Sequence, residues 1–280
     1  MKTIGTLIQE GCKYLSLHGI DTPHLDCELI LQHVLSVERS FIIMNGADSI
    51  AEQKEHLFWQ LVEKRVKRHP ISHIIGRREF WSSDFIVSRD VLDPRPDSET
   101  VISTVLKYYK NKGQRLKVAD FGTGTGCLLI SMLSEYKFAV GVAFEKSLKA
   151  YRVAYKNIKK HNLLGKIKIF PNSWVECNDS FDLIISNPPY IRRDKLKTLQ
   201  AEVQKEPVAA LDGGISGSDC YLSIFSVLRK CLRKNKFAVL EIGEDQGNIE
   251  RLVHLYGLAF QEYVYDLSGM KRCIVVKKIC

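Results

Sequence analysis

The sequence predicts an α/β fold, in which a doubly wound, mostly parallel sheet with an antiparallel last strand is preceded by a small N-terminal helical bundle. Three observations predict it. The first 70 residues carry apolar side chains at helical spacing. From Leu116 onward, apolar β-type runs alternate with helical segments, which is typical of parallel sheets. The chain ends in two β-rich runs that leave no room for a crossover helix.

Residues 1–70 are expected to form the helical bundle. Apolar side chains recur at helical spacing in Leu7, Ile8, Cys12 and Leu15. Thr22 as an N-cap and Pro23 at the first helical position mark a second helix, and a later helical segment ends before Pro70. Helices this short need one another's surfaces to be stable. This part shows no catalytic constellation, so we expect a recognition or scaffolding domain.

A hairpin and a stiff linker, residues 71–96, are expected to connect the two parts. The first part of this range alternates as a strand does, around a polar turn at residues 82–84. In the linker "DPRPDSET", two prolines within three residues keep the chain extended. Asp97 or Ser98 then caps a helix that should stop at Gly113.

The domain formed by residues 97–280 should hold the sheet. Strands are expected at 116–121, 138–144, 166–170, 181–186 and 236–242. The two final β-rich runs flank a turn at Ser268 and Gly269, so they should be antiparallel neighbours.

The composition, 45% hydrophobic and 26% charged, is ordinary for a soluble globular protein. The N-terminus does not resemble a signal peptide, and no apolar run is long enough to span a membrane, so we expect a cytoplasmic protein. The eight cysteines are scattered without metal-ligand spacing, and we expect neither a metal site nor a disulfide framework.

The positive charge is unevenly distributed along the chain. Residues 1–90 hold 11 Lys and Arg against 12 Asp and Glu, whereas residues 91–280 hold 30 against 20. A basic surface of this kind suits RNA, a ribosomal complex or an acidic protein partner, and the sign of the charge does not choose among them.

A glycine-rich turn follows the first strand of the expected sheet. Gly122, Gly124 and Gly126 in "DFGTGTG" lie between that strand and an apolar helix. Such a turn lets a ligand approach the backbone closely, at a helix N-terminus that favours negative charge. The spacing is neither the G-x-G-x-x-G of dinucleotide enzymes nor a P-loop. By itself the turn fits a ligand site or a tight structural turn.

Glu145 stands at the tip of the second strand, where an acidic side chain can accept hydrogen bonds from both ribose hydroxyls of a nucleoside. It could equally be a solvated charge at the start of a helix. Together, Asp120, the glycine turn and Glu145 fit S-adenosylmethionine, whose carboxylate and ribose need these groups and which carries no phosphate.

The stretch "SFDLIISNPPYI" joins a strand too apolar to be half exposed to a polar turn. Pro188 and Pro189 cannot donate backbone hydrogen bonds and fix φ, so the chain leaves the sheet as a stiff, extended turn. Rigid carbonyls, the Asn187 amide and the Tyr190 ring then lie at the carboxyl end of a buried strand. Open α/β sheets bind their ligands at this edge.

Taken together, these motifs resemble the peptide chain release factor glutamine methyltransferases, the HemK/PrmC family, over essentially the whole chain. The matching pieces occur in the family's order: "DPRPDSET", "DFGTGTG", "EKSLKAYRVAYKN", "SNPPYI", "AEVQKEPVAALDGG", "LEIGEDQG" and "DLSGMKR". The glycine turn and NPPY occur in many amino methyltransferases. The linker and the Glu-Pro…Gly-Gly stretch are more discriminating.

The resemblance implies a Rossmann-like class I methyltransferase domain and an N-terminal domain that helps to hold the substrate. The implied reaction is methylation, by S-adenosylmethionine, of the glutamine in the Gly-Gly-Gln loop of class I peptide chain release factors, with S-adenosylhomocysteine as product. The chain departs from the family's usual residues at Asp93, Ser98, Glu145 and Ser173. The implied cofactor-binding residues are Asp120, Gly122, Thr123, Gly124, Thr125, Gly126, Glu145 at the ribose, Trp174 beside the adenine, and Asn187.

The stiff turn also suggests a mechanism. The Asn187 side-chain oxygen and the Pro188 carbonyl could each accept one N–H of a substrate glutamine, which would hold its poorly nucleophilic nitrogen in line with the methyl group. Positioning can lower a barrier by about 7–11 kcal/mol, so no strong general base is required. The expected catalytic residues are Asn187, Pro188 and Tyr190, and the same turn with Pro189 and with Leu92 from the linker would bind the substrate.

Two other functions fit parts of the pattern. Nucleic-acid amino methyltransferases use the same Asn-Pro-Pro-aromatic device on a flipped adenine or guanine. The N-terminal bundle is close to neutral, whereas a DNA-binding surface would be basic. Direct nucleic-acid binding is therefore not favoured. A non-catalytic S-adenosylmethionine-binding module that docks on a translation factor is the second alternative, against which the intact Asn187 argues.

Overall fold

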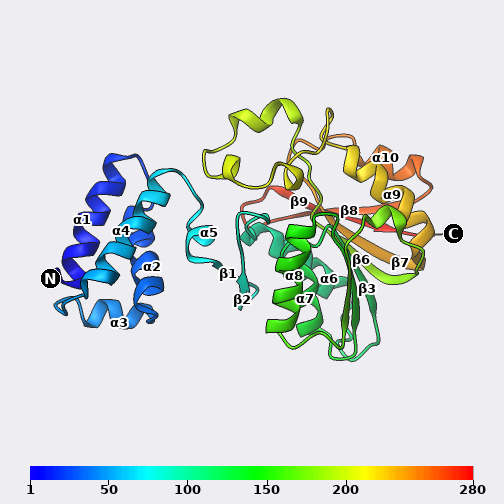
Figure 1. Cartoon of the computed structure of the whole chain (residues 1–280). Coiled ribbons are helices and arrows are strands. Elements are labelled where there is room, and N and C mark those ends of the chain that lie inside the picture. Colours follow the sequence, from blue (N-terminus) through cyan, green and yellow to red (C-terminus); the bar gives the residue numbers. More distant parts are fainter. Residues whose placement is uncertain (280) are drawn as a thin grey trace. The chain divides into compact units, whose positions relative to one another are not determined.

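The computed structural model describes residues 1–279, in which the chain divides into two compact units (Figure 1). The N-terminal unit comprises Met1–Arg77 together with Gln200–Lys205. The second unit comprises Arg78–Leu199 and the chain from Glu206 onward. A six-residue segment from the second half of the chain therefore belongs to the N-terminal unit.

The N-terminal unit is helical, as predicted. Its helices are α1 (Ile4–Leu17), α2 (Pro23–Leu35), α3 (Arg39–Met44), α4 (Glu52–Val66) and α5 (Ile71–Ile75). They enclose a core of fully buried side chains that includes Leu7, Leu15, Ile30, Phe58 and Val62. Pro23 begins α2 as predicted, but the Thr22 hydroxyl donates to Asp26 Oδ1 at 3.1 Å and caps no backbone amide.

The hairpin is formed by β1 (Arg77–Phe80) and β2 (Ser83–Ile86). Its turn lies at Trp81 and Ser82, both with positive φ, as in the two-residue turns that match strand twist. The predicted turn at residues 82–84 was therefore placed one residue too late. Residues 71–75 were also wrongly assigned to a strand, since Gly76 in the left-handed region ends a short helix there.

The linker enters the second unit through the 3-10 helix η1 (Pro96–Ser98) and then α6 (Glu99–Tyr108). This helix ends before the predicted Gly113. The next residue, Tyr109, has a buried side chain, and its hydroxyl donates to the Asp182 carbonyl. Ser98 directly precedes α6, as predicted, but its hydroxyl accepts no hydrogen bond from the first turn.

A mixed, seven-stranded sheet forms the centre of the second unit. Its strands are β3 (Lys117–Phe121), β4 (Val140–Phe144), β5 (Ile167–Phe170), β6 (Phe181–Ser186), β7 (Leu232–Glu241), β8 (Ala259–Tyr265) and β9 (Lys271–Lys277). Their order is β5-β4-β3-β6-β7-β9-β8. The first five strands in this order run parallel, and β9 is antiparallel to both β7 and β8. The predicted α/β fold with an antiparallel last strand is confirmed.

Helices cover both faces of this sheet (Figure 1). On one face, α6, α7 (Cys127–Glu135) and α8 (Leu148–Lys160) share a core with Val118 and Leu183. On the other face, α9 (Asp219–Cys231) and α10 (Ile249–Leu255) pack with Ala119 and Ile184. Successive strand residues thus point into different cores, which is why most residues of these strands are apolar. Further 3-10 helices are η2 (Trp174–Glu176), η3 (Arg193–Thr198), η4 (Val203–Lys205) and η5 (Val208–Ala210).

Within residues 1–279, every helix is too short or too polar to cross a membrane. The seven cysteines in that range are free thiols, and five of them are buried.

Candidate active site

A cavity of about 120 Å³ in the second unit brings together nine of the predicted site residues. It lies at the carboxyl ends of β3, β4 and β6, where the parallel register sets Asp120 beside Ile185. The nine residues are Leu92, Gly122, Thr123, Gly124, Thr125, Glu145, Trp174, Asn187 and Pro189. The structure places Asp120, Gly126, Pro188 and Tyr190 next to these residues in the chain but outside the cavity lining.

The glycine turn needs its glycines for two reasons. Gly122, Gly124 and Gly126 all have φ between 56° and 83°, the left-handed region that other residues rarely adopt. A Cβ on Gly122 would also lie 3.3 Å from the Trp174 ring, whereas one on Gly124 would meet no atom within 4 Å. The turn therefore exposes bare backbone at Gly124 to the cavity.

Asp120 lies beneath this turn, 1% exposed. Its Oδ2 accepts a hydrogen bond from the Thr123 hydroxyl at 2.6 Å, and its Oδ1 has no hydrogen-bond partner among the described residues. Burial raises the pKa of Asp120 to about 7, against the Thr123 hydrogen bond and with help from the charge of Glu145. A buried carboxyl oxygen without a partner fits a positively charged ligand group.

Glu145 follows β4 and is almost buried. Its Oε2 accepts from the Gly124 amide at 3.0 Å and its Oε1 from the Ser147 amide at 2.8 Å. Each carboxylate oxygen can accept a further hydrogen bond, so both remain usable by a ligand. Glu145 thus links the glycine turn to the start of α8.

Trp174 closes another side of the cavity. Its ring stacks on Phe121 with an interplanar angle of 17°, and its indole N–H donates to the Ser223 hydroxyl at 2.9 Å. These contacts fix a flat apolar surface beside Gly122, which suits an aromatic base.

Asn187 follows β6 directly, and its side-chain nitrogen donates to the Ser98 hydroxyl at 3.2 Å. Ser98 itself interacts with Glu241, the last residue of β7. Burial raises the pKa of Glu241 to about 7, opposed by the nearby Ser98 hydroxyl and by the charge of Arg272. The amide of Asn187 is therefore anchored by the residue that directly precedes α6.

The turn after Asn187 is held by the "EPVAALDGG" segment. The Ile191 amide donates to the Leu211 carbonyl at 3.0 Å, and the Gly213 amide donates to the Ile191 carbonyl at 2.8 Å. A Cβ on Gly213 would lie 2.7 Å from the Tyr190 backbone, so this position requires glycine. The Tyr190 hydroxyl lies 3.3 Å from Glu241 Oε1, which directs the side chain towards the end of β7.

The sequence reasoning missed several residues of this site. Ser98 was considered as a helix cap and as a departure from the family's usual residue, but not as a partner of Asn187. The fully buried Asn157 side chain forms hydrogen bonds with the backbone of Ile86. Its Nδ2 also donates to the Thr125 carbonyl at 2.9 Å, so Asn157 connects the hairpin to the glycine turn. It was the last residue of the quoted "EKSLKAYRVAYKN", but its periodicity marked it only as a residue on the helix.

A buried charge cluster was missed as well. Glu206, 4% exposed, accepts from the Asp93 amide at 3.0 Å and pairs with Arg95. Asp93 is itself buried, with its Oδ2 3.4 Å from an Arg95 nitrogen. The next residues after Glu206, namely Pro207, Ala209 and Ala210, line the cavity. The linker and the "EPVAALDGG" segment thus meet at the cavity wall.

Among residues 1–279, no group of three or more His, Cys, Asp or Glu side chains is arranged to hold a metal ion.

Comparisons with known proteins identify both parts of the chain. Residues 6–76 match the PrmC N-terminal domain model, and residues 79–214 match the methyltransferase small domain model. The catalytic domain of hMettl16, solved in complex with a MAT2A 3′UTR hairpin, has a TM-score of 0.58 at 14% identity over 79% of this chain and 81% of that chain. At that identity the likeness concerns the fold alone.

Relatives of similar length share more sequence. The release factor glutamine methyltransferase of Rhodospirillum rubrum is 31% identical over 98% of this chain and 85% of its own. Those of Caulobacter vibrioides and Clostridium botulinum are 33% and 32% identical, over 92% and 97% of this chain and 90% and 98% of their own. The chain is an S-adenosylmethionine-dependent enzyme and belongs to the family of release factor glutamine methyltransferases.

Proposed function

We propose that this enzyme methylates the side-chain amide nitrogen of the glutamine in the Gly-Gly-Gln loop of class I peptide chain release factors. The observation that carries the proposal is the position of Asn187, whose amide nitrogen is bound by Ser98 inside a cavity also lined by the glycine turn and Glu145. A nucleoside-binding edge and an amide-binding group therefore share one cavity.

The cavity residues fit S-adenosylmethionine, which supplies when bound a methyl group made electrophilic by its sulfonium. Asp120, which lies beneath the glycine turn and outside the cavity lining, would balance the charge of the amino group with its unpartnered carboxyl oxygen. Gly124 leaves open space where a side chain would block the methionine portion. Glu145 has acceptor capacity left for ribose hydroxyls. The flat ring of Trp174 would cover the adenine.

The substrate glutamine would meet the other side of the cavity. We infer that Asn187 Oδ1 accepts one amide N–H and the Pro188 carbonyl the other, which fixes the amide plane and draws electron density towards nitrogen. Pro189 and Leu92, which line the cavity, would confine the side chain. We keep Tyr190 as a predicted packing partner of the amide, because it directly follows the turn.

The N-terminal unit would bind the body of the release factor. In support, it exposes large apolar side chains, among them Leu17, Leu25, Phe41, Ile43 and Met44. The last three belong to the short helix α3, and exposed apolar surface that is contiguous is typical of protein-binding sites. The near-neutral charge of residues 1–90 also suits a protein better than a nucleic acid.

The test is incubation of the purified enzyme with methyl-labelled S-adenosylmethionine and a class I release factor, followed by peptide mapping. We expect label on the Gly-Gly-Gln glutamine and none on a release factor in which that glutamine is replaced by glutamate. Label on RNA or DNA offered in the same reaction, with none on the release factor, would contradict the proposal.

A further inference from the structure

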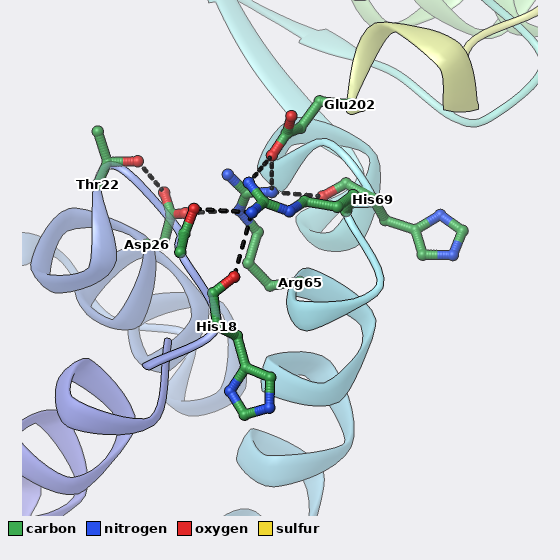
Figure 2. Close-up of polar contacts among 8 residues, drawn as sticks. His18, Thr22, Asp26, Arg65, His69 and Glu202 are labelled. Atoms are coloured by element: carbon green, nitrogen blue, oxygen red, sulfur yellow. Dashed lines mark hydrogen bonds and ion pairs between the residues drawn. The ribbon is translucent and has the colours of Figure 1, made fainter. Parts of the chain in front are cut away.

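A partly buried ion-pair cluster holds the segment Gln200–Lys205 on the N-terminal unit (Figure 2). At its centre is Arg65, which is 7% exposed. Arg65 Nε donates to Asp26 Oδ2 at 2.6 Å, and its Nη1 donates to Glu202 Oε1 at 2.8 Å. The same Glu202 oxygen accepts from Arg68 Nη1 at 3.2 Å.

Both guanidinium groups are fixed by residues 1–77, independently of Glu202. Asp26, 2% exposed, also receives the Thr22 hydroxyl. Arg68 Nη2 donates to the carbonyls of His18 and Gly19 at 3.1 and 2.7 Å. The N-terminal unit therefore presents two oriented cations, to which a carboxylate from the second half of the chain binds. A guanidinium held in this way keeps its direction at little entropic cost.

Glu202 is only four positions before Glu206, the residue fixed by the Asp93 amide and Arg95. The intervening residues form the 3-10 turn η4, in which the Lys205 amide donates to the Glu202 carbonyl at 3.0 Å. This hydrogen-bonded turn restricts the backbone between Glu202 and Glu206. Pro207, Ala209 and Ala210 of the cavity wall follow immediately.

We propose that the Arg65–Glu202 ion pair is a positioning contact for methyl transfer, which fixes the chain segment that leads directly into the wall of the cavity. Arg65 and Glu202 contact neither cofactor nor substrate in this role. They act through the chain that leads to Pro207, Ala209 and Ala210. The inference rests on the proposed function only for its choice of substrate, and it gives the N-terminal unit a second task besides holding the release factor.

The test uses Glu202, because its side chain is 25% exposed and its removal leaves Asp26 paired with Arg65. Glu202→Ala removes the ion pair, and Glu202→Gln keeps an oxygen that can accept from Arg65. Glu10→Ala is the matched control, since it removes another ion pair of the same unit, with Lys2 at 2.7 Å, that has no connection to the cavity wall. All variants are made in the full chain.

The first readout is amide hydrogen exchange across residues 206–212, where the Ala210, Leu211 and Asp212 amides bond to nearby carbonyls. Loss of a charged hydrogen bond should speed their exchange by at least about tenfold in Glu202→Ala. Glu202→Gln should be intermediate and Glu10→Ala unchanged. Unchanged exchange at 206–212 in Glu202→Ala would overturn the proposal.

The second readout is kcat and KM, measured with a release factor and with a short Gly-Gly-Gln peptide. A displaced wall should lower kcat severalfold on both substrates, whereas a lost grip on the release factor would raise only the KM for the protein. The latter pattern, or a change in melting temperature alone, would contradict the positioning role. If the wild-type enzyme labels neither substrate, the proposed function fails, and the exchange rates still decide for or against the positioning contact.

Discussion

The side-chain nitrogen of Asn187 lies 3.2 Å from the hydroxyl oxygen of Ser98. The Asn187 nitrogen can only donate, so the Ser98 oxygen accepts this hydrogen bond. This arrangement determines which end of the Asn187 amide is the nitrogen. The Oδ1 atom is therefore the end available to accept a hydrogen bond in the cavity.

Ser98→Ala should reduce methyl transfer without displacing the cofactor. The variant frees the Asn187 amide to rotate, and the loss of one hydrogen bond of about 1–1.5 kcal/mol predicts a fall in kcat of roughly tenfold. The affinity for S-adenosylmethionine, measured by calorimetry, should stay close to wild type. Ser98→Thr, which keeps the hydroxyl, should be active, and Ser103→Ala on the exposed side of α6 is the control. Equal kcat in Ser98→Ala and Ser103→Ala would disprove the role of Ser98.

Asn187→Ala should bind cofactor almost normally and lose most methyl transfer, because it removes the acceptor proposed to contact the reacting nitrogen. The expected loss in kcat is larger than that of Ser98→Ala, since the acceptor itself is gone. Single-turnover rates with a release factor, together with cofactor affinity, provide the measurement. Wild-type turnover in this variant would rule out the proposed mechanism.

Glu145→Ala should weaken the binding of S-adenosylmethionine by about 1.5–3 kcal/mol, the range for hydrogen bonds to a charged group. Glu145→Ala also leaves the Gly124 and Ser147 amides without their acceptor. Glu145→Gln is therefore the more specific variant, because it retains one side-chain oxygen as an acceptor. Calorimetry should give the order wild type, Gln, Ala. Glu176→Ala, an exposed carboxylate on η2, is the control. An unchanged dissociation constant would make Glu145 a structural residue only.

Met44→Asp should weaken the enzyme's hold on a release factor if the exposed apolar residues of the N-terminal unit bind it. A charge placed there would have to be desolvated on binding, which predicts a KM for the protein substrate at least tenfold higher, with kcat little changed. The short Gly-Gly-Gln peptide should be unaffected. Leu267→Asp places the same charge on a fully exposed leucine of the second unit and is the control. Equal effects of both variants would contradict this binding surface.

Much of the fold could be predicted because its signals are local. Strand β6 is buried at every position and ends directly before Asn187, and the three glycines form the predicted turn between β3 and α7. The residues before the hairpin were harder to assign from the sequence. Ile71–Ile75 has the β-branched, alternating composition of a strand, but Pro70 and Gly76 limit it to a single helical turn.

The contacts that complete the site could not be predicted from local patterns. Ser98 and Asn187 are 89 residues apart, and nothing near Ser98 indicates that its hydroxyl faces a partner other than its own helix. Asp93 was noted as a departure from the family's usual residue and Glu206 as part of a matching stretch, but charged residues are usually solvated, and their shared burial became visible only in the fold. Glu202 likewise binds Arg65 across 137 positions.

The last prediction concerns Asp120 and pH. Its pKa is raised by burial from 3.8 to about 7, so the native protein holds this proton more tightly than the unfolded chain does. The corresponding stability is complete below about pH 4 and is lost as the pH rises to about 7. Asp120→Asn stays neutral at every pH and keeps the acceptor for Thr123. Without cofactor, wild type should therefore lose on the order of 3 kcal/mol relative to Asp120→Asn between pH 4.5 and 8.

Thermal unfolding of both proteins at pH 4.5, 6 and 8 gives the measurement, with Asp21→Asn, an exposed carboxylate of the N-terminal unit, as control. Glu241, also titrating near pH 7, is present in every variant and cancels from the comparison. Bound cofactor should favour the ionised form of Asp120, because its ammonium group is positively charged. Saturating S-adenosylmethionine should therefore stabilise wild type more than Asp120→Asn at pH 8. A difference between the two proteins that stays constant with pH would mean that Asp120 is ionised throughout, and its buried oxygen would then need another partner.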